Sequence, residues 1–328
     1  MKTGQYDLSI AKKFCSITNH EITYQVLKKD LNLRYGENPH QKGGYWNSIQ
    51  DQSGLIMGCE KIHGKELSYN NILDTALGLE LLDEFEEPAV VIVKHNNPCG
   101  VCESDNLFLS YQKAHDCDPV SAYGGVFLFN REVDEKIARH ILSIFAEVLC
   151  APSFSKEALT ILQEKKNMRL LSRLFPKTTN SEIRTAGNGF LIQEKDTKIA
   201  DELVVKNGKD LTLDQIADIK FGLKIVKHVK SNAIVVVKHL CTLGICGGQP
   251  NRINSTMMSL KQAGEKAQGA VLCSDAFFPF ADSLIEASKY GIKIVVEPGG
   301  SIRDTEIIDE AKKHDIILVF SGLRHFLH

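Results

Sequence analysis

No apolar run in this 328-residue sequence approaches the ~20 residues that a helix needs to span a bilayer. The first residues, Met1 to Asp7, also lack the apolar core of a signal peptide, and we therefore expect a cytoplasmic protein. Neither sign of charge is in excess, because 39 Lys and Arg stand against 41 Asp and Glu. The net charge of −2 gives no support for a nucleic-acid partner or for binding to an anionic membrane.

The sequence has only nine cysteines, and they are unevenly spaced. Without a signal peptide, these are expected as reduced thiols in cores and loops. Residues 98–102 have the Pro-Cys-x-x-Cys spacing of a zinc deaminase. That site also needs a His or Cys followed two positions later by Glu, whereas His95 is followed by Asn96 and Asn97. We therefore expect no metal site and interpret Cys99 and Cys102 as structural thiols.

Helical and strand-like segments alternate along most of the chain. Apolar spacing predicts helices over 72–82, 107–114, 132–145, 155–166, 213–229, 255–268, 281–290 and 304–314. Short apolar, β-branched runs predict strands over 89–93, 126–129, 168–174, 233–237, 270–272, 292–296 and 316–320. This alternation is typical of a layered α/β protein with helices on the faces of a sheet.

The central stretch is Ala89–Gly100. Its apolar run leads directly into Lys94-His95, and we expect these two residues on a turn closed by Pro98 and Gly100. Loops at strand ends are where α/β proteins place their chemistry. His transfers protons readily near neutral pH, and a neighbouring Lys supplies a cation. An isolated Lys-His pair is more often incidental, but its position at a strand end favours a catalytic role.

The Lys-His pair recurs as Lys238-His239, at a spacing of 144 residues. Each pair ends an apolar strand and precedes a Gly-bearing stretch, the second of which is Gly244–Gly248. We interpret the second pair as a structural relic of duplication, since it lacks the Asn-Asn-Pro that follows the first. The polar region 176–210 marks the boundary, which predicts one half over 1–195 and the other over 196–328.

Three loops leave alternatives open. Arg34 either binds a phosphate or carboxylate or pairs with a nearby acid on the surface. The three Phe of Phe277–Phe280 either bind a flat heteroaromatic ligand or form a core cluster or subunit interface. Asp282 either accepts N–H groups of an aminopyrimidine or serves as a first-turn helix acid. Gly244–Gly248 is no P-loop and is more simply a tight turn.

Nine ordered stretches from about residue 31 to the C-terminus resemble the transformylase portion of the AICAR formyltransferase/IMP cyclohydrolase family. They are LRYGENPHQ (33–41), KELSYNNILD (65–74), VKHNNPCGV (93–101), DPVSAYGG (118–125), SNAIVVVK (231–238), GGQPNR (247–252), SDAFFPF (274–280), PGGS (298–301) and RHFLH (324–328). The resemblance implies transfer of a formyl group from 10-formyltetrahydrofolate to the 5-amino group of AICAR. About thirty residues precede these motifs, too few for the cyclohydrolase domain, so we expect a stand-alone formyltransferase.

The resemblance also implies a fold and a set of site residues. The fold is two tandem cytidine-deaminase-like α/β halves without zinc. His95 would accept a proton from the amine, Lys94 would assist this transfer and protonate the departing folate nitrogen, and Asn232 would orient the carboxamide and the developing oxyanion. The residues implied to bind the nucleotide are Arg34, Tyr35, Tyr123, Gly124, Arg252, Phe277, Arg324 and Phe326. Those implied to bind the folate are Pro279, Asp282 and Ser301.

The implied partners are small molecules and a second copy. We expect AICAR, 10-formyltetrahydrofolate as co-substrate rather than a tightly bound cofactor, and a homodimer with active sites at its interface. A separate IMP cyclohydrolase is a candidate partner, and K⁺ a candidate ion. Cys246, Ala281 and Glu147 depart from the family pattern, which bears on folate affinity. Alternative functions are a non-catalytic AICAR- or folate-binding regulator and a zinc-dependent deaminase.

Overall fold

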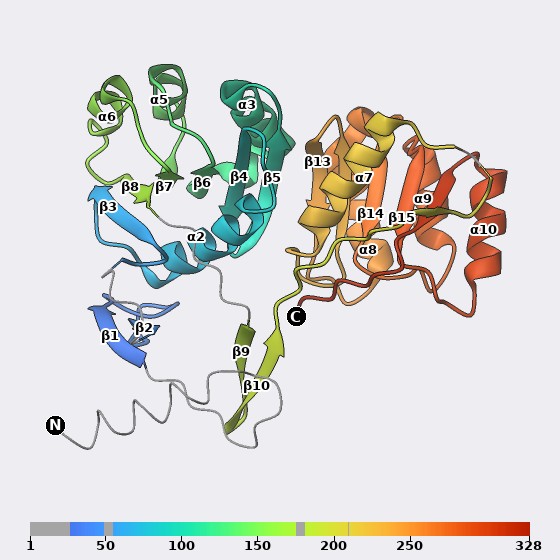
Figure 1. The fold of residues 1–328 in the computed structure, drawn as a ribbon, viewed down its shortest axis with the longest axis horizontal. Coiled ribbons are helices and arrows are strands. Elements are labelled where there is room, and N and C mark those ends of the chain that lie inside the picture. Colours follow the sequence, from blue (N-terminus) through green and yellow to red (C-terminus); the bar gives the residue numbers. More distant parts are fainter. Residues whose placement is uncertain (1–26, 49–54, 175–180, 209) are drawn as a thin grey trace.

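The computed structural model describes residues 27–48, 55–174, 181–208 and 210–328. Its main feature is a twelve-stranded sheet with the strand order β11-β16-β15-β14-β12-β13-β5-β4-β6-β7-β8-β3 (Figure 1). Its strands are β3 (Cys59–His63), β4 (Ala89–Lys94), β5 (Asn97–Glu103), β6 (Gly125–Phe129), β7 (Ala146–Ala151), β8 (Arg169–Arg173), β11 (Val204–Val205), β12 (Ile234–Lys238), β13 (Cys241–Cys246), β14 (Val271–Ser274), β15 (Ile294–Glu297) and β16 (Ile317–Phe320). Two separate hairpins pair β1 (Leu27–Asn32) with β2 (Gly44–Ser48) and β9 (Ser181–Ala186) with β10 (Gly189–Glu194).

Helices cover both faces of the sheet. They are α2 (Tyr69–Leu82), α3 (Leu107–Cys117), α4 (Pro119–Ala122), α5 (Glu135–Leu142), α6 (Lys156–Leu162), α7 (Leu213–Val226), α8 (Arg252–Ala263), α9 (Asp282–Lys289) and α10 (Asp304–Lys313), with a 3₁₀ turn at Gly264–Ala267. One continuous apolar core lies under α2 and α7, and two further cores lie on the opposite face. Strands buried on both faces explain the unbroken apolar runs in the sequence.

The strand order repeats within the sheet. The order β5-β4-β6-β7-β8 in the first half matches β13-β12-β14-β15-β16 in the second, and the pairings are antiparallel and parallel at the same places. The antiparallel contact of β5 with β13 joins the two halves into one sheet. The mixed α/β class expected from the sequence is therefore confirmed, while the cytidine-deaminase-like assignment of the halves 1–195 and 196–328 stays a prediction.

Several predicted boundaries were wrong. Pro98 and Gly100 lie inside β5 rather than closing a turn, because the turn after β4 consists of only two residues. Gly244 likewise lies inside β13 rather than in a turn. The polar stretch after residue 176 includes the β9–β10 hairpin, whose alternation of apolar and polar residues is short and weak. Helix α2 begins three residues earlier than predicted, since Ser68 and Asn71 form a capping box.

The expectation of reduced thiols fails for two cysteines. Cys102 on β5 and Cys241 on β13 form a disulfide between directly opposite residues of neighbouring strands. It closes across 139 residues and connects the two halves, a pairing that only the tertiary fold brings together. The six other cysteines of the described ranges are free and buried.

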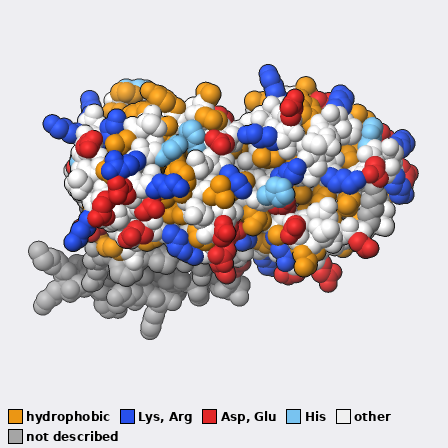
Figure 2. All heavy atoms as spheres, turned by 90° about the horizontal axis from the view of Figure 1, so that it is seen from above, with side chains coloured by type: hydrophobic (Ala, Val, Ile, Leu, Met, Phe, Trp, Pro, Cys, Tyr) orange, Lys and Arg blue, Asp and Glu red, His pale blue; other side chains and the backbone are white. Residues whose placement is uncertain are grey.

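The surface carries mixed charge, as the composition predicted. Figure 2 shows Lys and Arg side chains interspersed with Asp and Glu on the face in view. Among the helices of the described ranges, none combines the length and apolar character needed to cross a membrane.

Candidate active site

Strand directions place the predicted site residues along one edge of the sheet. Strand β4 ends there at Lys94, and its antiparallel neighbour β6 begins beside it. Because β5 and β13 are antiparallel, the second half is inverted relative to the first. The start of β12 and the ends of β14, β15 and β16 therefore lie on this same edge. Carboxyl ends of parallel strands commonly form ligand sites in α/β proteins.

The Lys94-His95 pair lies on a tight hairpin. His95 and Asn96 form a two-residue turn with φ of 52° and 57°, the left-handed values that such hairpins require. Asp74 on α2 stabilises the turn by accepting a hydrogen bond from Asn96 N at 2.6 Å. Burial raises the pKa of the Asp74 carboxyl, and the Asn96 N–H opposes this rise. The His95 side chain is exposed at the tip, where it can reach a ligand.

The Lys94 side chain is oriented by a hydrogen bond to Gly124, which directly precedes β6. Its Nζ donates to Gly124 O at 2.7 Å. Gly124 has a φ of +68°, and a Cβ there would lie 3.0 Å from this Nζ, so only glycine fits without displacing the lysine. The neighbouring Tyr123 is 67% exposed, and its ring centroid lies 5.1 Å from that of Phe145. Lys94, Tyr123 and Gly124 therefore lie together in the structure.

The second Lys-His pair has the same arrangement, built from corresponding residues. His239 and Leu240 have φ of 54° and 55°, and both N–H groups donate to Asp218 on α7. Lys238 Nζ donates to Gln268 O at 2.8 Å. Each of these residues follows its counterpart by 144 positions. Because β12 runs opposite to β4, however, this turn lies on the far edge of the sheet, away from the other predicted site residues.

Arg34 and Tyr35 line a cavity of about 440 Å³. Lys65 and Arg169, at the start of β8, supply two more cations to its wall. Arg169 Nε donates to Glu66 O at 3.0 Å, and its Nη1 lies 3.8 Å from Glu147. Within the described residues, neither Arg34 nor Lys65 has an acidic partner, which disfavours the alternative that Arg34 pairs with a nearby acid. A cavity whose wall carries two cations without acidic partners in the described ranges suits an anionic ligand.

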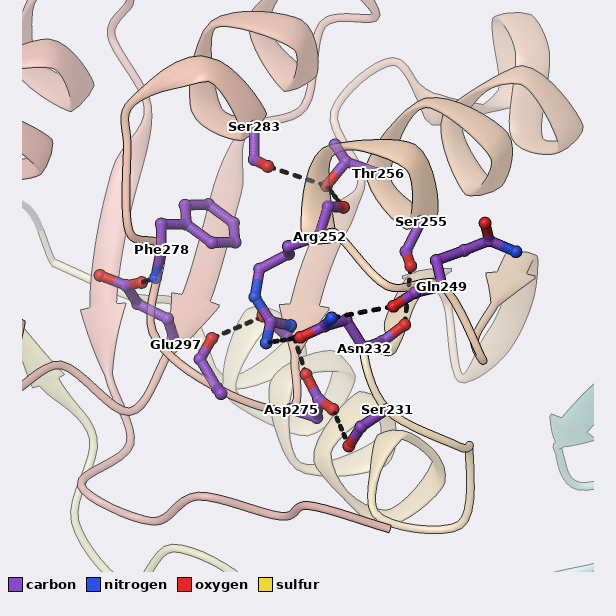
Figure 3. Close-up of polar contacts among 12 residues, drawn as sticks. Ser231, Asn232, Gln249, Arg252, Ser255, Thr256, Asp275, Phe278, Ser283 and Glu297 are labelled. Atoms are coloured by element: carbon purple, nitrogen blue, oxygen red, sulfur yellow. Dashed lines mark hydrogen bonds and ion pairs between the residues drawn. The ribbon is translucent and has the colours of Figure 1, made fainter. Parts of the chain in front are cut away.

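Asn232 lies just before β12 in a buried polar network (Figure 3). Its Oδ1 accepts from Arg252 Nη2 at 2.7 Å, and Ser255 Oγ donates to its backbone oxygen at 2.7 Å. The Arg252 guanidinium also pairs with Asp275 and donates to Ser274 Oγ at 2.9 Å. The Ser231–Asn232 peptide bond is cis. Arg252 is only 6% exposed, so its main contacts are inside the protein.

The amide of Asn232 is fully hydrogen-bonded. Its Nδ2 donates to Gln249 O at 2.8 Å and to Pro250 O at 3.2 Å. An amide NH₂ has two hydrogens, and both have acceptors here. A ligand oxygen would therefore have to replace one of these acceptors, and the longer contact with Pro250 is the weaker of the two.

A Phe-bearing loop lies beside this network. Phe277, Pro279 and Phe280 are exposed, whereas Phe278 is fully buried and its N–H donates to Glu297 at the end of β15 (Figure 3). Glu297 has no exposed surface, and its second oxygen has no hydrogen-bond partner in the described chain. Burial raises the pKa of this carboxyl to about 7.

The remaining predicted residues also lie on this edge. Asp282 is the exposed first residue of α9, and Ser301 N donates to Asp304 at 2.8 Å before α10. Arg324 and Phe326 are exposed on the C-terminal segment, with the guanidinium carbon 4.5 Å from the ring centroid. The C-terminal end lies between the two halves (Figure 1).

The three residues that depart from the family pattern lie in different environments. Glu147 accepts a hydrogen bond from Asn71 at 3.0 Å and contributes a charge near Arg169. Cys246 ends β13, with its sulfur 3.8 Å from that of Met258. Ala281 precedes α9 and makes no side-chain cap.

The structure separates these residues into two groups. Strands β5 and β13 stand between β4 and β12, so the Lys94 and Asn232 ends are three strand spacings, or ~14 Å, apart. Across the described ranges, no hydrogen bond or ion pair joins Lys94 or His95 to Asn232 or Arg252. One group thus carries the Lys94-His95 pair and the Arg34 cavity, and the other carries Asn232, the Phe-bearing loop and the C-terminal segment.

Sequence reasoning missed several residues of the site. Lys65 and Arg169 complete the cavity, and Ser231 and Asp275 complete the Asn232 network. All of these residues except Arg169 lie inside the nine motifs, so the sequence held the information that could have identified them. In the described part of the chain, no group of three or more His, Cys, Asp or Glu is arranged to hold a metal ion. Because Cys102 is bonded to Cys241, it cannot join Cys99 as a thiolate ligand.

Comparison with known proteins agrees with the motif pattern. Residues 1–262 match the family model described as AICARFT/IMPCHase bienzyme. The bifunctional purine biosynthesis protein PurH of Bacillus cytotoxicus is 46% identical over 312 residues, covering 94% of this chain and 61% of that protein. PurH of Bacillus cereus is 47% identical over 333 residues, and PurH of Ruminiclostridium cellulolyticum is 43% identical over 338 residues. These last two alignments cover 99% of this chain, which spans 65% of the length of each relative.

Proposed function

Because the chain belongs to the AICARFT/IMPCHase bienzyme family, we propose that it acts in purine biosynthesis as an AICAR formyltransferase. The reaction transfers the formyl group of 10-formyltetrahydrofolate to the 5-amino group of AICAR, giving FAICAR and tetrahydrofolate. The observation that carries this proposal is the Lys94-His95 hairpin, whose exposed imidazole and oriented ammonium lie on the edge that holds the other motif residues. The PurH relatives are bifunctional by name, and this proposal concerns the formyl-transfer activity only.

The chemistry requires a base. The 5-amino group is a poor nucleophile, because the ring withdraws its lone pair, so attack on the formyl carbon needs removal of a proton. His95 at the hairpin tip is the proposed acceptor. Lys94, held by Gly124 O, lies next to it and is the proposed donor to the departing folate nitrogen.

The formyl oxygen gains negative charge as the tetrahedral intermediate forms. Asn232 is the proposed donor to this oxygen through the Nδ2 hydrogen that faces Pro250. The Arg252 guanidinium behind Asn232 keeps Oδ1 turned away from the ligand side and so fixes which end of the amide can donate.

The cavity at Arg34 is the proposed site for the 5′-phosphate of AICAR. Among the described residues, neither Arg34 nor Lys65 pairs with an acid, and a phosphate would supply a negative charge for both. Phe277, Pro279, Asp282 and Ser301 are proposed to bind the flat rings of the two substrates, as the resemblance implies.

The separation of the two groups supports a homodimer with shared sites. Formyl transfer needs the base and the oxyanion donor within a few ångströms of one reacting centre. Their strand ends are ~14 Å apart in one chain. A second copy that faces this edge would bring the proton-transfer pair of one chain to Asn232 of the other.

Turnover of AICAR with 10-formyltetrahydrofolate, followed as release of tetrahydrofolate, tests the proposal. His95→Ala is expected to reduce kcat by ~10²–10⁴, the range for loss of a general base. The matched control is His239→Ala, which removes the same side chain from an equivalent turn on the far edge. Equal activity of both variants, or a wild type that does not release tetrahydrofolate, would refute the proposed reaction.

Mixing two inactive variants tests the shared site. If His95 and Asn232 act across a dimer, co-refolded His95→Ala and Asn232→Ala chains regain activity, because about a quarter of their sites are intact. If both residues act within one chain, the mixture stays inactive. AICAR binding without turnover would instead favour the regulator, and stoichiometric zinc would favour the deaminase.

A further inference from the structure

The hydrogen bonds around Asn232 extend to the C-terminal segment Ser321–His328 and meet at one carboxylate. Asp275 has no exposed surface. Its Oδ1 pairs with Arg252, its Oδ2 accepts from Ser231 Oγ at 2.6 Å, and its backbone oxygen accepts from His325 N at 2.9 Å. None of the motif-based roles includes this residue.

We propose that Asp275 is a positioning residue that holds Asn232 and the C-terminal segment in a fixed position relative to each other. This inference rests on the proposed function, since it concerns how two groups of that site are oriented together.

The link to Asn232 runs through Arg252. The Asp275 carboxylate fixes the guanidinium of Arg252, and the guanidinium in turn donates to Asn232 Oδ1 at 2.7 Å. This contact decides the orientation of the amide, because the opposite orientation would direct the NH₂ group at a cation that has no acceptor. Without the carboxylate, a buried cation would lose its partner and move, and Asn232 would lose its orientation.

The link to the C-terminal segment runs through Ser231. Its Oγ donates to Asp275 and accepts from Leu327 N at 3.2 Å, while its N–H donates to Leu327 O at 2.8 Å. Asp275 itself anchors His325 N, two residues earlier. The segment is thus held at two points that flank Phe326.

These anchors set the direction of the exposed side chains. His325 is buried, with Nδ1 2.6 Å from Asp196, whereas Arg324 and Phe326 on either side of it point outward. In an extended segment, neighbouring residues face opposite sides, so fixing His325 and Leu327 fixes where Arg324 and Phe326 project. Asp275 therefore acts on both groups: its carboxylate holds the proposed oxyanion donor through Arg252 and the segment through Ser231, and its backbone oxygen holds His325.

Two substitutions separate these links. Ser231→Ala cuts only the hydroxyl link to the segment and is expected to raise KM for AICAR about three- to tenfold with little change in kcat. Asp275→Asn disturbs both links and is expected to lower kcat and raise KM together, reducing kcat/KM about 100-fold or more. Because Ser231 and Asp275 share a hydrogen bond, the double variant Ser231→Ala/Asp275→Asn should lose less than the sum of the two single effects.

The matched control is Ser283→Ala. Ser283 is buried in the same region, and Thr256 Oγ1 donates to its hydroxyl at 3.1 Å without reaching Asn232 or the segment (Figure 3). It should lower the melting temperature about as much as Ser231→Ala and leave KM and kcat unchanged. Identical kinetics for Ser231→Ala and Ser283→Ala, or fully independent effects of Ser231→Ala and Asp275→Asn, would overturn the proposal.

Hydrogen exchange gives a readout that does not depend on turnover. Asp275→Asn and Ser231→Ala should both speed amide exchange at Leu327, whose N–H is held through Ser231 Oγ. Asp275→Asn should have a smaller effect at His325, because the backbone oxygen that holds its N–H is retained, and Ser283→Ala should change neither amide. Unchanged exchange at these amides in both variants would contradict the coupling. A wild type without turnover would refute the proposed function instead, and the exchange result would still decide whether Asp275 holds the segment.

Discussion

Replacing the buried carboxyl of Glu297 by an amide is predicted to change how the free energy of unfolding depends on pH. Burial raises the pKa of Glu297 from an ordinary 4.5 to about 7, with Asp304 adding to the rise and the Phe278 N–H and Arg252 opposing it. A shift of this size corresponds to ~3 kcal/mol of differential stability between the two protonation states. Glu297→Gln keeps an oxygen for Phe278 N but cannot ionise.

The sign of this pH dependence follows from the number of protons bound in the folded and unfolded states. Between pH 4.5 and 7 the folded chain holds the Glu297 proton, whereas the unfolded chain has released it. The wild type therefore loses stability through this group as pH rises across that window, and the loss is complete above pH 7. Relative to the wild type, Glu297→Gln should gain ~3 kcal/mol in total, most of it between pH 5 and 8.

Urea unfolding of both proteins at pH 5, 6, 7 and 8 measures this difference, because the contributions of all other groups cancel. Glu310→Gln is the control. Lys313 and His314 lower the pKa of exposed Glu310 below its ordinary value of 4.5, so the contribution of this group changes only below that pH. The stability curves of this variant and of the wild type should therefore be parallel from pH 5 to 8. Parallel stability curves for the wild type and Glu297→Gln would refute the assignment of a buried, half-protonated carboxyl.

Two further predictions concern the junction of the halves. Gly100→Ala would place its Cβ 1.9 Å from the backbone oxygen of Ala114, so thermal unfolding should show a loss of ~1–3 kcal/mol, and an unchanged melting temperature would contradict this packing. Non-reducing peptide mapping should recover Cys102 joined to Cys241. Because the bond closes across 139 residues, Cys102→Ser should cost ~2–5 kcal/mol under oxidising conditions, whereas Cys246→Ser, at the equivalent strand position in the second half, removes only a free thiol. Recovery of both cysteines as free thiols would refute the bond.

The sequence predicted the layers of this fold because local patterns encode them. Apolar runs marked the buried strands, and helical spacing marked the helices between them. The spacing of 144 residues between the two Lys-His pairs also indicated a duplication, and the hydrogen bonds of Asp74 and Asp218 show the same spacing. Turn boundaries were predicted less well, because Pro98 and Gly100 are typical of turns but here occupy positions in β5.

Which residues meet in space depended on the inversion of one half relative to the other. The sequence by itself determined that each half carries a Lys-His pair at the end of an apolar strand, since this pattern is local to each half. Only the tertiary structure decided that one turn shares an edge with Asn232 and the C-terminal segment, while the other lies on the far edge. It also decided which ionisable groups are buried, because the pairing of Asp275 with Arg252 and the contact of Glu297 with Phe278 depend on packing between different elements of the fold.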